Sequence, residues 1–454
     1  MKRTLPELIV DFLQFSDDAR PSAEQFGRFS SGKWRYALRW MDDTGLALYF
    51  LRKLRDGNAT SRVPAFVLQR LEANLAANER RSVYMQQQFA VLNRKLNNAG
   101  VKYAAVKGLT LIPQFCPDRA LRHQNDFDYL VDEQSLPGAR MALEEMGYCL
   151  YKRTDWECIY GMPSQTSVVP GHEQYEAEAP HAVELHLTIG EWQDLLLTEP
   201  QFLENTIVKT SGDVPFPALP EEQAFLLQSL HAFYHILGNW LRLSWLFEIA
   251  YFFETRHADR QLWDGLARNL ADDSRLREMV ALVSELTTQF FRVPAPLPIR
   301  MWQAELRPPV RVWIDHYARK WVFGGNRIDE FTLFPTRRLP LFLCQQFMAG
   351  SLRAGVLRRL VPLARVSRVA RTVAAEPSAA FRPEFRRRER LFRRSLFHLG
   401  AGLRYLWEVP RWKWLNMKYA SAIVPPRHAA HHAVEMPSRD SPILNGPPSC
   451  RPGS

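Results

Sequence analysis

Three short β-prone runs, set between two long helical patterns, constrain the fold of this chain more than any other feature. The runs are residues 101–106, 125–131 and 182–189, and each is a short apolar stretch or alternates apolar and polar side chains. Apolar residues recur every three or four positions before them, at 67–96, and after them, at 220–291. This arrangement predicts an α+β fold.

The second run begins with two aspartates that are one residue apart, Asp126 and Asp128. On a strand, residues i and i+2 point to the same face, so both carboxylates face one way and Phe127 faces the other. Aligned carboxylates repel unless a cation or a shared proton lies between them. The pair therefore suits a divalent ion, above all Mg²⁺, although Asp-x-Asp is also common in surface turns. Changing either Asp to Asn is expected to leave fold stability unchanged or to raise it.

The first and third runs add charged residues to this pair. The first run is followed directly by Lys107-Gly108, and residues 109–112 are expected to open a helix after this turn. Such a turn lets the backbone and a helix N-terminus approach phosphate, and Lys107 adds a positive charge. Glu184 and His186 share one face of the third run. The roles open to His186 are to orient a carboxylate, to contact phosphate, to act as a base or to make a structural hydrogen bond. Together the runs predict a metal-assisted phosphoryl-transfer site.

The order of several motifs resembles the nucleotidyltransferase superfamily whose fold is shared with DNA polymerase β. More closely, the chain is similar to a bacterial family of nucleotidyltransferase-like proteins. The resemblance covers about residues 80–260 and rests on Val106-Lys107-Gly108, Arg122, the run from Asp126 to Val131, Val183-Glu184-Leu185-His186, the run from Leu230 to His235, and the run from Leu241 to Glu248. It implies a mixed-sheet core flanked by N-terminal and C-terminal helical regions.

The resemblance also implies transfer of a nucleotidyl group from an NTP to an acceptor, with release of pyrophosphate. The implied cofactor is Mg²⁺ or Mn²⁺, and the implied catalytic and metal-binding residues are Asp126, Asp128 and Glu184. The implied nucleotide-binding residues are Lys107, Gly108, Arg122 and His186. An alternative for Arg122 is an ion pair at the surface with Asp118 or Asp132.

Three positions depart from the pattern of that superfamily, which uses Gly-Ser or Gly-Gly after its first strand. Leu109 follows the glycine here and offers no hydroxyl to a triphosphate, so Lys107 or Thr110 would have to compensate. Asn125 stands where a glycine often precedes the aspartate pair, and Glu184 stands where many members have Asp. These departures leave open a non-catalytic module with this fold that binds nucleotides or a protein partner.

His231 and His235 lie four residues apart within the helical pattern 220–291, which is the spacing of a metal-ligand pair on one helix face. The residue after His231 is Ala232, so the Glu of a zinc-protease motif is missing. Packing or hydrogen bonding against the core is therefore the preferred interpretation of both histidines.

At 454 residues the chain exceeds one ordinary domain, and its patterns divide it into five regions. A helical region precedes an α/β core, which is followed by a helical domain packed on the core, a basic Arg/Trp-rich helical region and a disordered tail. The predicted ranges are 1–100, 101–215, 216–293, 294–419 and 420–454. The prolines at 294, 296 and 298 predict a linker at the start of the basic region.

The positive charge of the chain is concentrated near its C-terminus. Residues 300–420 contain 25 Lys and Arg against 8 Asp and Glu, a balance of +17, which leaves −6 for the rest of the net charge of +11. This region is expected to meet a polyanion, such as nucleic acid, or an anionic membrane surface. Residues 386–394 combine basic and aromatic side chains on one expected helix. The alternatives are a solvated Arg-rich surface and a basic adaptor for membrane or nucleic acid without transfer chemistry.

Three further features indicate a cytoplasmic protein. The sequence has no uncharged apolar run of about 18 residues, so no transmembrane segment is expected. At the N-terminus, Glu7 and Asp11 interrupt any signal-like apolar core. The five cysteines are scattered and form no CxxC pair, which indicates a reducing compartment and argues against structural zinc.

Overall fold

The computed structural model describes residues 3–16, 23–162, 175–177, 179–187, 202–238, 241–323, 338–347, 399, 403 and 406–420. The strands are β1 Tyr103–Val106, β2 Asp126–Val131, β3 Cys149–Arg153, β4 Glu157–Gly161, β5 Ala182–His186, β6 Ile207–Ser211 and β7 Val214–Ala218. The helices are α1 Leu5–Phe12, α2 Ser31–Thr44, α3 Ala47–Asp56, α4 Ala65–Asn98, α5 Leu136–Glu145, α6 Glu221–Leu237, α7 Leu243–Arg256, α8 Arg260–Asn269, α9 Ser274–Phe291, α10 Leu297–Ala304, α11 Pro308–Trp313, α12 Arg319–Phe323 and α13 Arg338–Phe347. Residues 406–420 are also helical.

The described strands form one mixed sheet in the order β3-β4-β5-β2-β1-β7-β6. At its centre, β2 runs parallel to β5 and antiparallel to β1, and β1 runs parallel to β7. The outer pairs β3–β4 and β6–β7 are antiparallel hairpins. The α+β class and the mixed sheet predicted from the sequence are therefore confirmed.

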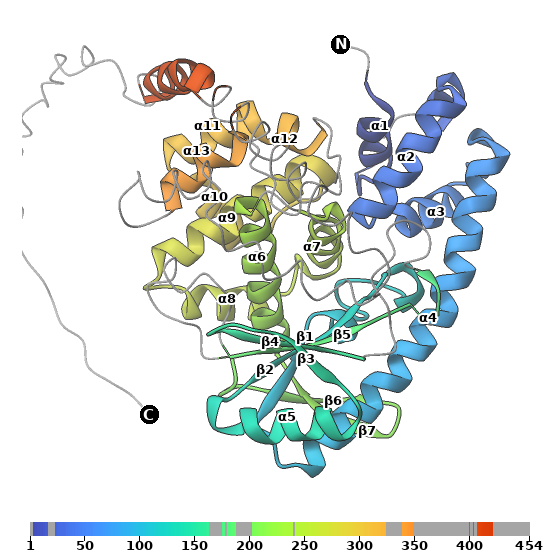
Figure 1. The fold of residues 1–454 in the computed structure, drawn as a ribbon. Coiled ribbons are helices and arrows are strands. Elements are labelled where there is room, and N and C mark those ends of the chain that lie inside the picture. Colours follow the sequence, from blue (N-terminus) through green and yellow to red (C-terminus); the bar gives the residue numbers. More distant parts are fainter. Residues whose placement is uncertain are drawn as a thin grey trace, which may run out of the picture.

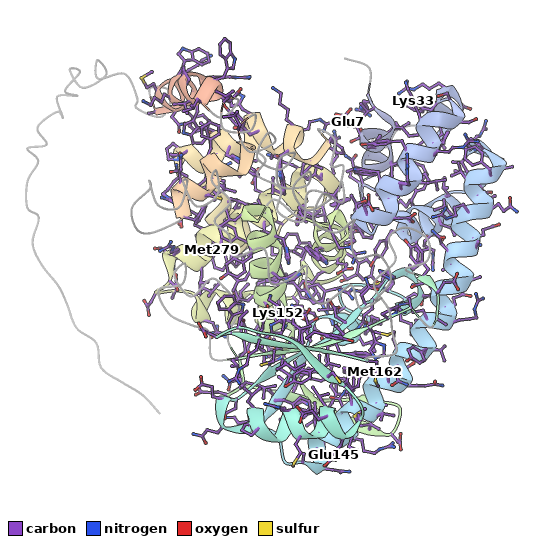
Figure 2. The ribbon with its side chains drawn as sticks, in the orientation of Figure 1. Glu7, Lys33, Glu145, Lys152, Met162 and Met279 are labelled. Carbon is purple, nitrogen blue, oxygen red and sulfur yellow. The ribbon has the colours of Figure 1, made fainter. Side chains whose placement is uncertain are left out.

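Strand β2 contributes to two separate apolar layers, one on each face of the sheet. Phe127 and Tyr129 join a cluster with Phe89 of α4 and Leu143 of α5. Leu130 points the other way, into a larger cluster that includes α6, α7 and α9. Figure 1 shows α5 below the sheet and the helices from α6 onward above it, and Figure 2 shows the exposed Glu145 at the outer side of α5. Alternation along β2 thus turns its aspartates toward the layer of α6.

Helices from both ends of the chain share this larger cluster. Its members run from Leu5 in α1 to Leu415 in the helix of residues 406–420. A backbone hydrogen bond of 2.9 Å from Phe15 to the carbonyl oxygen of Phe291 joins the segment after α1 to the end of α9. The division of the chain into five regions remains a prediction.

Two local predictions differ from the structure, and proline explains both. Gly108–Leu111 forms a single 3₁₀ turn instead of opening a helix, because Ile112 precedes a proline and is held in the extended conformation. The predicted proline linker at 294–298 leads directly into α10, where Pro298 occupies the first turn, a position that needs no N–H donor. The helical pattern at 67–96 is confirmed by α4, which ends at Asn98, just before Gly100 with its φ of +63°.

Several sequence predictions fall on residues outside the described part of the chain. These are the basic stretch 386–394 and the predicted tail from residue 421 onward. Among the described residues, no helix combines the length and apolar character that crossing a membrane requires.

Candidate functional site

Three neighbouring strands bring the predicted acidic residues and Lys107 together on the sheet. The register of β2 and β5 pairs Asp128 with Glu184. On the other side of β2, strand β1 ends opposite Asp128 and is followed directly by Lys107. Asp126 shares the face of Asp128 because the two are separated by one residue. The predicted charged residues therefore meet on the side of the sheet that faces α6.

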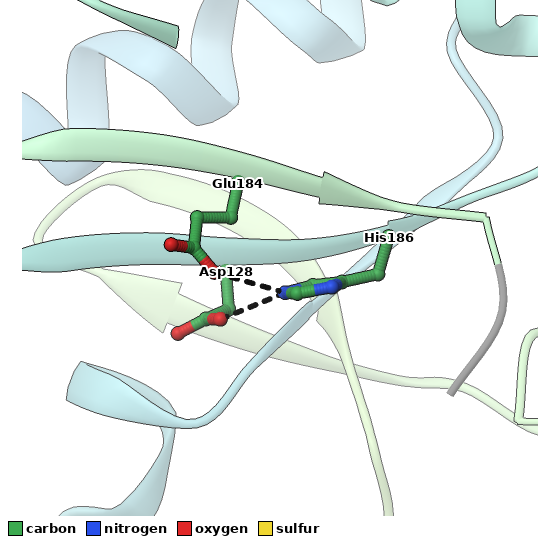
Figure 3. A group of neighbouring side chains, drawn as sticks. All are labelled: Asp128, Glu184 and His186. Carbon is green, nitrogen blue, oxygen red and sulfur yellow. Dashed lines mark hydrogen bonds and ion pairs between the residues drawn. The ribbon is translucent and has the colours of Figure 1, made fainter. Parts of the chain in front are cut away.

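Asp128 is the centre of this site. Lys107 Nζ lies 2.7 Å from Asp128 Oδ1, and His186 Nε2 lies 2.9 Å from the same oxygen. His186 Nε2 is also 3.6 Å from Glu184 Oε2. Figure 3 shows the side chains of Asp128, Glu184 and His186 converging from the two parallel strands. Because Asp128 is only 6% exposed, water screens these charges weakly.

The crowded carboxylates respond in opposite directions. Burial acts to raise the pKa of Asp128, but Lys107 and the His186 hydrogen bond outweigh it and hold that pKa well below its usual range. Burial, with the charges of Asp128 and Asp126, raises the pKa of Glu184 to about 8. Burial and the charge of Asp128 also raise the pKa of Asp126. Without a further cation, Asp128 is thus ionised near neutral pH while Glu184 mostly retains a proton.

The turn after β1 fixes the position of Lys107. Lys107 and Gly108 both have left-handed backbone angles, with φ of +54° and +46°. A Cβ at Gly108 would lie 2.4 Å from Gln124 Nε2, and that amide donates to the carbonyl oxygen of Asp126 at 2.8 Å. The Thr110 hydroxyl donates to the carbonyl oxygen of Lys107 at 2.7 Å. Thr110 therefore holds the turn together, while the Lys107 ammonium enters the site.

Arg122 lies in a buried ion pair that reaches across to α7. Its Nε is 3.2 Å from Glu248 Oε1, and the Tyr49 hydroxyl donates to the same oxygen at 3.2 Å. Burial acts to lower the pKa of Arg122, but Glu248 raises it above the ordinary value. Its partner is therefore a carboxylate of α7 and not one of the surface aspartates considered from the sequence. The charge of Arg122 also acts to lower the pKa of Asp126, so the two are electrostatically coupled.

Arg81, on the buried side of α4, is a site-forming residue that sequence reasoning missed. Its guanidinium donates to the carbonyl oxygens of Gln124 at 2.9 Å, Glu176 at 3.0 Å and Ala179 at 2.9 Å. It thereby joins the segments that precede β2 and β5. Burial lowers its pKa to about 10. A charged residue in a helical pattern is usually a solvated one, and only the fold brings these carbonyl groups around Arg81.

His231 and His235 pack together on α6. Their ring centroids are 4.4 Å apart, and the rings lie 4.4 Å and 4.6 Å from that of Trp245 on α7. Burial, with the positive charge of Lys107, lowers the pKa of His231 well below its ordinary value. These contacts agree with the packing interpretation and make His231 a neutral neighbour of the Lys107 ammonium.

A protein-family model described as an uncharacterised nucleotidyltransferase matches residues 30–292, more than half of the chain. The chain belongs to this family. The matched range runs from the N-cap of α2 to the C-cap of α9, so it includes the whole described sheet and every predicted site residue. Neither the curated proteins nor the solved structures gave a match.

The acidic cluster of this family member has donors that fit a divalent cation. One ligand atom from each of Asp128, Glu184 and His186 lies within 4.8 Å of the others. Carboxylates and an imidazole together suit a divalent metal ion. The positive charge of a bound cation would also relieve the repulsion that raises the pKa of Glu184. Asp128 would then contact both this cation and the Lys107 ammonium.

Proposed function

We propose that the chain is a metal-dependent nucleotidyltransferase of the superfamily whose fold is shared with DNA polymerase β. It would move a nucleotidyl group from an NTP to an acceptor and release pyrophosphate. The observation that carries this proposal is the convergence of Lys107, Glu184 and His186 on the buried carboxylate of Asp128. Such a cluster can hold a cation and a triphosphate in a site with little water, where charges interact strongly.

Asp126, Asp128 and Glu184 would hold the divalent ion, Mg²⁺ or Mn²⁺, with His186 beside them. When bound, the ion would supply positive charge that neutralises the phosphates and favours attack on phosphorus. Lys107 would stabilise the negative charge that develops on the leaving pyrophosphate. His186, with Nε2 at 2.9 Å from Asp128 and 3.6 Å from Glu184, would hold both carboxylates in place.

Glu184 is the proposed general base. It would accept the proton of the acceptor hydroxyl while the oxygen of that group attacks the α-phosphorus. The bond from this phosphorus to the oxygen bridging to the β-phosphate would break, and pyrophosphate would leave. The ion would relieve the repulsion that raises the pKa of Glu184, so that its carboxylate would be ionised and able to accept this proton.

Two further predicted residues would position the nucleotide. Gly108 would shape the turn that carries the Lys107 ammonium toward the triphosphate, since a side chain at this position would collide with Gln124. Arg122 would add positive potential to the site while it remains paired with Glu248.

Cys116, Cys149, Cys158 and Cys344 are free thiols, which supports a reducing compartment such as the cytoplasm.

A non-catalytic nucleotide-binding module is the second candidate. Lys107 Nζ is already in contact with Asp128 Oδ1, where it neutralises a carboxylate proposed for the metal. Leu109 also offers no hydroxyl to a triphosphate. This candidate predicts NTP binding that depends on a divalent ion but releases no pyrophosphate.

Transfer of label distinguishes the two candidates. The protein would be incubated with each NTP labelled at the α-phosphate, with Mg²⁺ or Mn²⁺, and with lysate fractions containing protein, RNA or small molecules. We expect one fraction to acquire label. Glu184→Gln should reduce that transfer by at least about 10²-fold while NTP binding is largely retained, because the base is lost and Asp126 and Asp128 still hold the nucleotide-bound ion. The exposed Glu145→Gln serves as the matched control.

Two outcomes would contradict the proposal. Equal transfer by Glu184→Gln and the unchanged protein would remove Glu184 from the chemistry. Retained NTP binding with no labelled product in any fraction would favour the non-catalytic module.

A further inference from the structure

The helix of residues 406–420 lies at the periphery of the molecule, beyond the range of the family match. Figure 1 shows it in red beside α11 and α13, and Figure 2 shows its side chains projecting from the edge of the molecule. Its inner face is held by Trp412 and Leu415, which are 8% and 7% exposed. The Trp412 ring stacks on Phe342 of α13 at a centroid distance of 4.7 Å. The helix is therefore anchored on one face.

The outer face of the same helix is apolar. Leu406, Trp407, Trp414 and Met417 are 63%, 85%, 54% and 65% exposed. At about 100° of rotation per residue, these four side chains fall within one arc of about 100°. A continuous stripe of large apolar side chains, two of them tryptophan, differs from the scattered apolar residues of an ordinary protein surface.

Positive charge flanks this apolar arc. By the same helical rotation, Lys413 lies on one side of the arc, and Arg411 and Lys418 lie on the other. The acidic residue of the stretch, Glu408, is half-buried and is paired with Arg411 at 3.4 Å. An apolar stripe with tryptophan between basic rows matches the interface of an anionic lipid bilayer, where tryptophan lies at headgroup level and lysine meets lipid phosphate.

We propose that residues 406–420 form an interfacial helix that docks the protein on an anionic membrane surface. The arc of Leu406, Trp407, Trp414 and Met417 enters the headgroup region, while Arg411, Lys413 and Lys418 contact the acidic lipids. Trp412 and Leu415 keep the helix attached to the body of the protein. The docking surface is separate from the nucleotidyltransferase site, so it goes beyond the proposed reaction.

Flotation of the full-length protein with lipid vesicles tests this proposal. Vesicles of phosphatidylcholine with phosphatidylglycerol would be compared with vesicles of phosphatidylcholine alone. We expect flotation with the anionic vesicles, and Trp407→Ser/Trp414→Ser should weaken the partition by at least about tenfold, because two large side chains no longer enter the interface. Lys413→Gln/Lys418→Gln should weaken binding to the anionic vesicles most.

The matched control is Val208→Ser/Met301→Ser, which removes two exposed apolar side chains elsewhere and should float like the unchanged protein. The thermal unfolding midpoint of the tryptophan variant should be unchanged, since both rings are exposed. If Trp407→Ser/Trp414→Ser does not fold, Trp407→Ser alone provides the same comparison, with a smaller expected loss of vesicle binding.

Three results would overturn the proposal. Undiminished flotation of the tryptophan variant would assign membrane binding to another part of the chain. No flotation of the unchanged protein, together with a molecular mass by light scattering that falls in the variant, would assign the face to a second copy of the chain. Loss of binding to poly(U) RNA in the tryptophan variant, without any effect on vesicles, would assign it to nucleic acid.

Discussion

At the scale of single residues, the two aspartates of β2 have different surroundings. Asp128 is paired with Lys107 and His186, whereas burial and the neighbouring charge raise the pKa of Asp126. The ion pair changes the expectation drawn from sequence, in which both carboxylates only repel each other. A lowered pKa means that ionised Asp128 stabilises the folded state above its ordinary pKa, and a raised pKa means that ionised Asp126 destabilises it.

We therefore predict opposite effects of two isosteric changes at pH 7. Asp128→Asn should lower the free energy of unfolding by about 3 kcal/mol, because it leaves the largely enclosed Lys107 ammonium without its closest carboxylate. Asp126→Asn should leave it unchanged or raise it by about 1 kcal/mol. Urea denaturation in the presence of a chelator measures both values. Equal losses in the two variants would mean that the Lys107 ion pair does not stabilise the fold.

Glu184 provides a prediction that depends on pH. Its pKa rises from an ordinary value of 4.5 to about 8 on folding, so between these values the folded state keeps a proton that the unfolded state has lost. The contribution of Glu184 to stability is thus fully present below pH 4.5 and is lost as the pH rises through 8. The unfolding midpoint of Glu184→Gln, relative to the unchanged protein without metal, should increase across this range. A difference that stays constant with pH would contradict the raised pKa.

At the scale of elements, the turn after β1 can be tested by its glycine. Gly108→Ala places a Cβ 2.4 Å from Gln124 Nε2 at a φ of +46°, whereas Gly212→Ala has a φ of +62° and meets no atom within 4 Å. The free energy of unfolding of the Gly212 variant, measured by urea denaturation, should fall by about 1 kcal/mol from backbone strain alone. The free energy of unfolding of the Gly108 variant should fall by about 2 kcal/mol more than this, because the Gln124 amide that donates to the Asp126 carbonyl oxygen must move. Equal losses would show that Gln124 moves without cost.

The elements differ in how well the sequence indicates them. β1, β2 and β5 lie in the middle of the sheet, so burial leaves an apolar pattern that predicts them. β3 and β6 lie at the two edges and are largely exposed on both faces, which leaves no such pattern. β7 contains Pro215 and Pro217, which normally argue against a strand. The order of the strands does not follow from these patterns, because pairing between distant segments is not a property of either segment.

At the scale of the whole molecule, the site depends on how the helical layer meets the sheet. Arg122 precedes β2 and Glu248 belongs to α7, and their buried ion pair joins the two layers. The sequence contains both residues within motifs of the resemblance, but it does not indicate that they are partners. The same holds for Arg81, whose carbonyl partners lie up to 99 positions away in the chain.

The last prediction separates the structural role of Arg122 from its proposed role toward the nucleotide. Arg122→Met leaves Glu248 buried and unpaired, and should lower the free energy of unfolding by about 3 kcal/mol. Arg122→Met/Glu248→Gln removes both charges and should recover most of that loss, since the Gln side chain can still accept from Tyr49. The recovered variant should nevertheless bind NTP at least about tenfold more weakly, because the positive charge coupled to Asp126 is absent. Titration with NTP and Mg²⁺ measures this affinity. Unchanged affinity in a variant with recovered stability would limit Arg122 to joining α7 and the sheet.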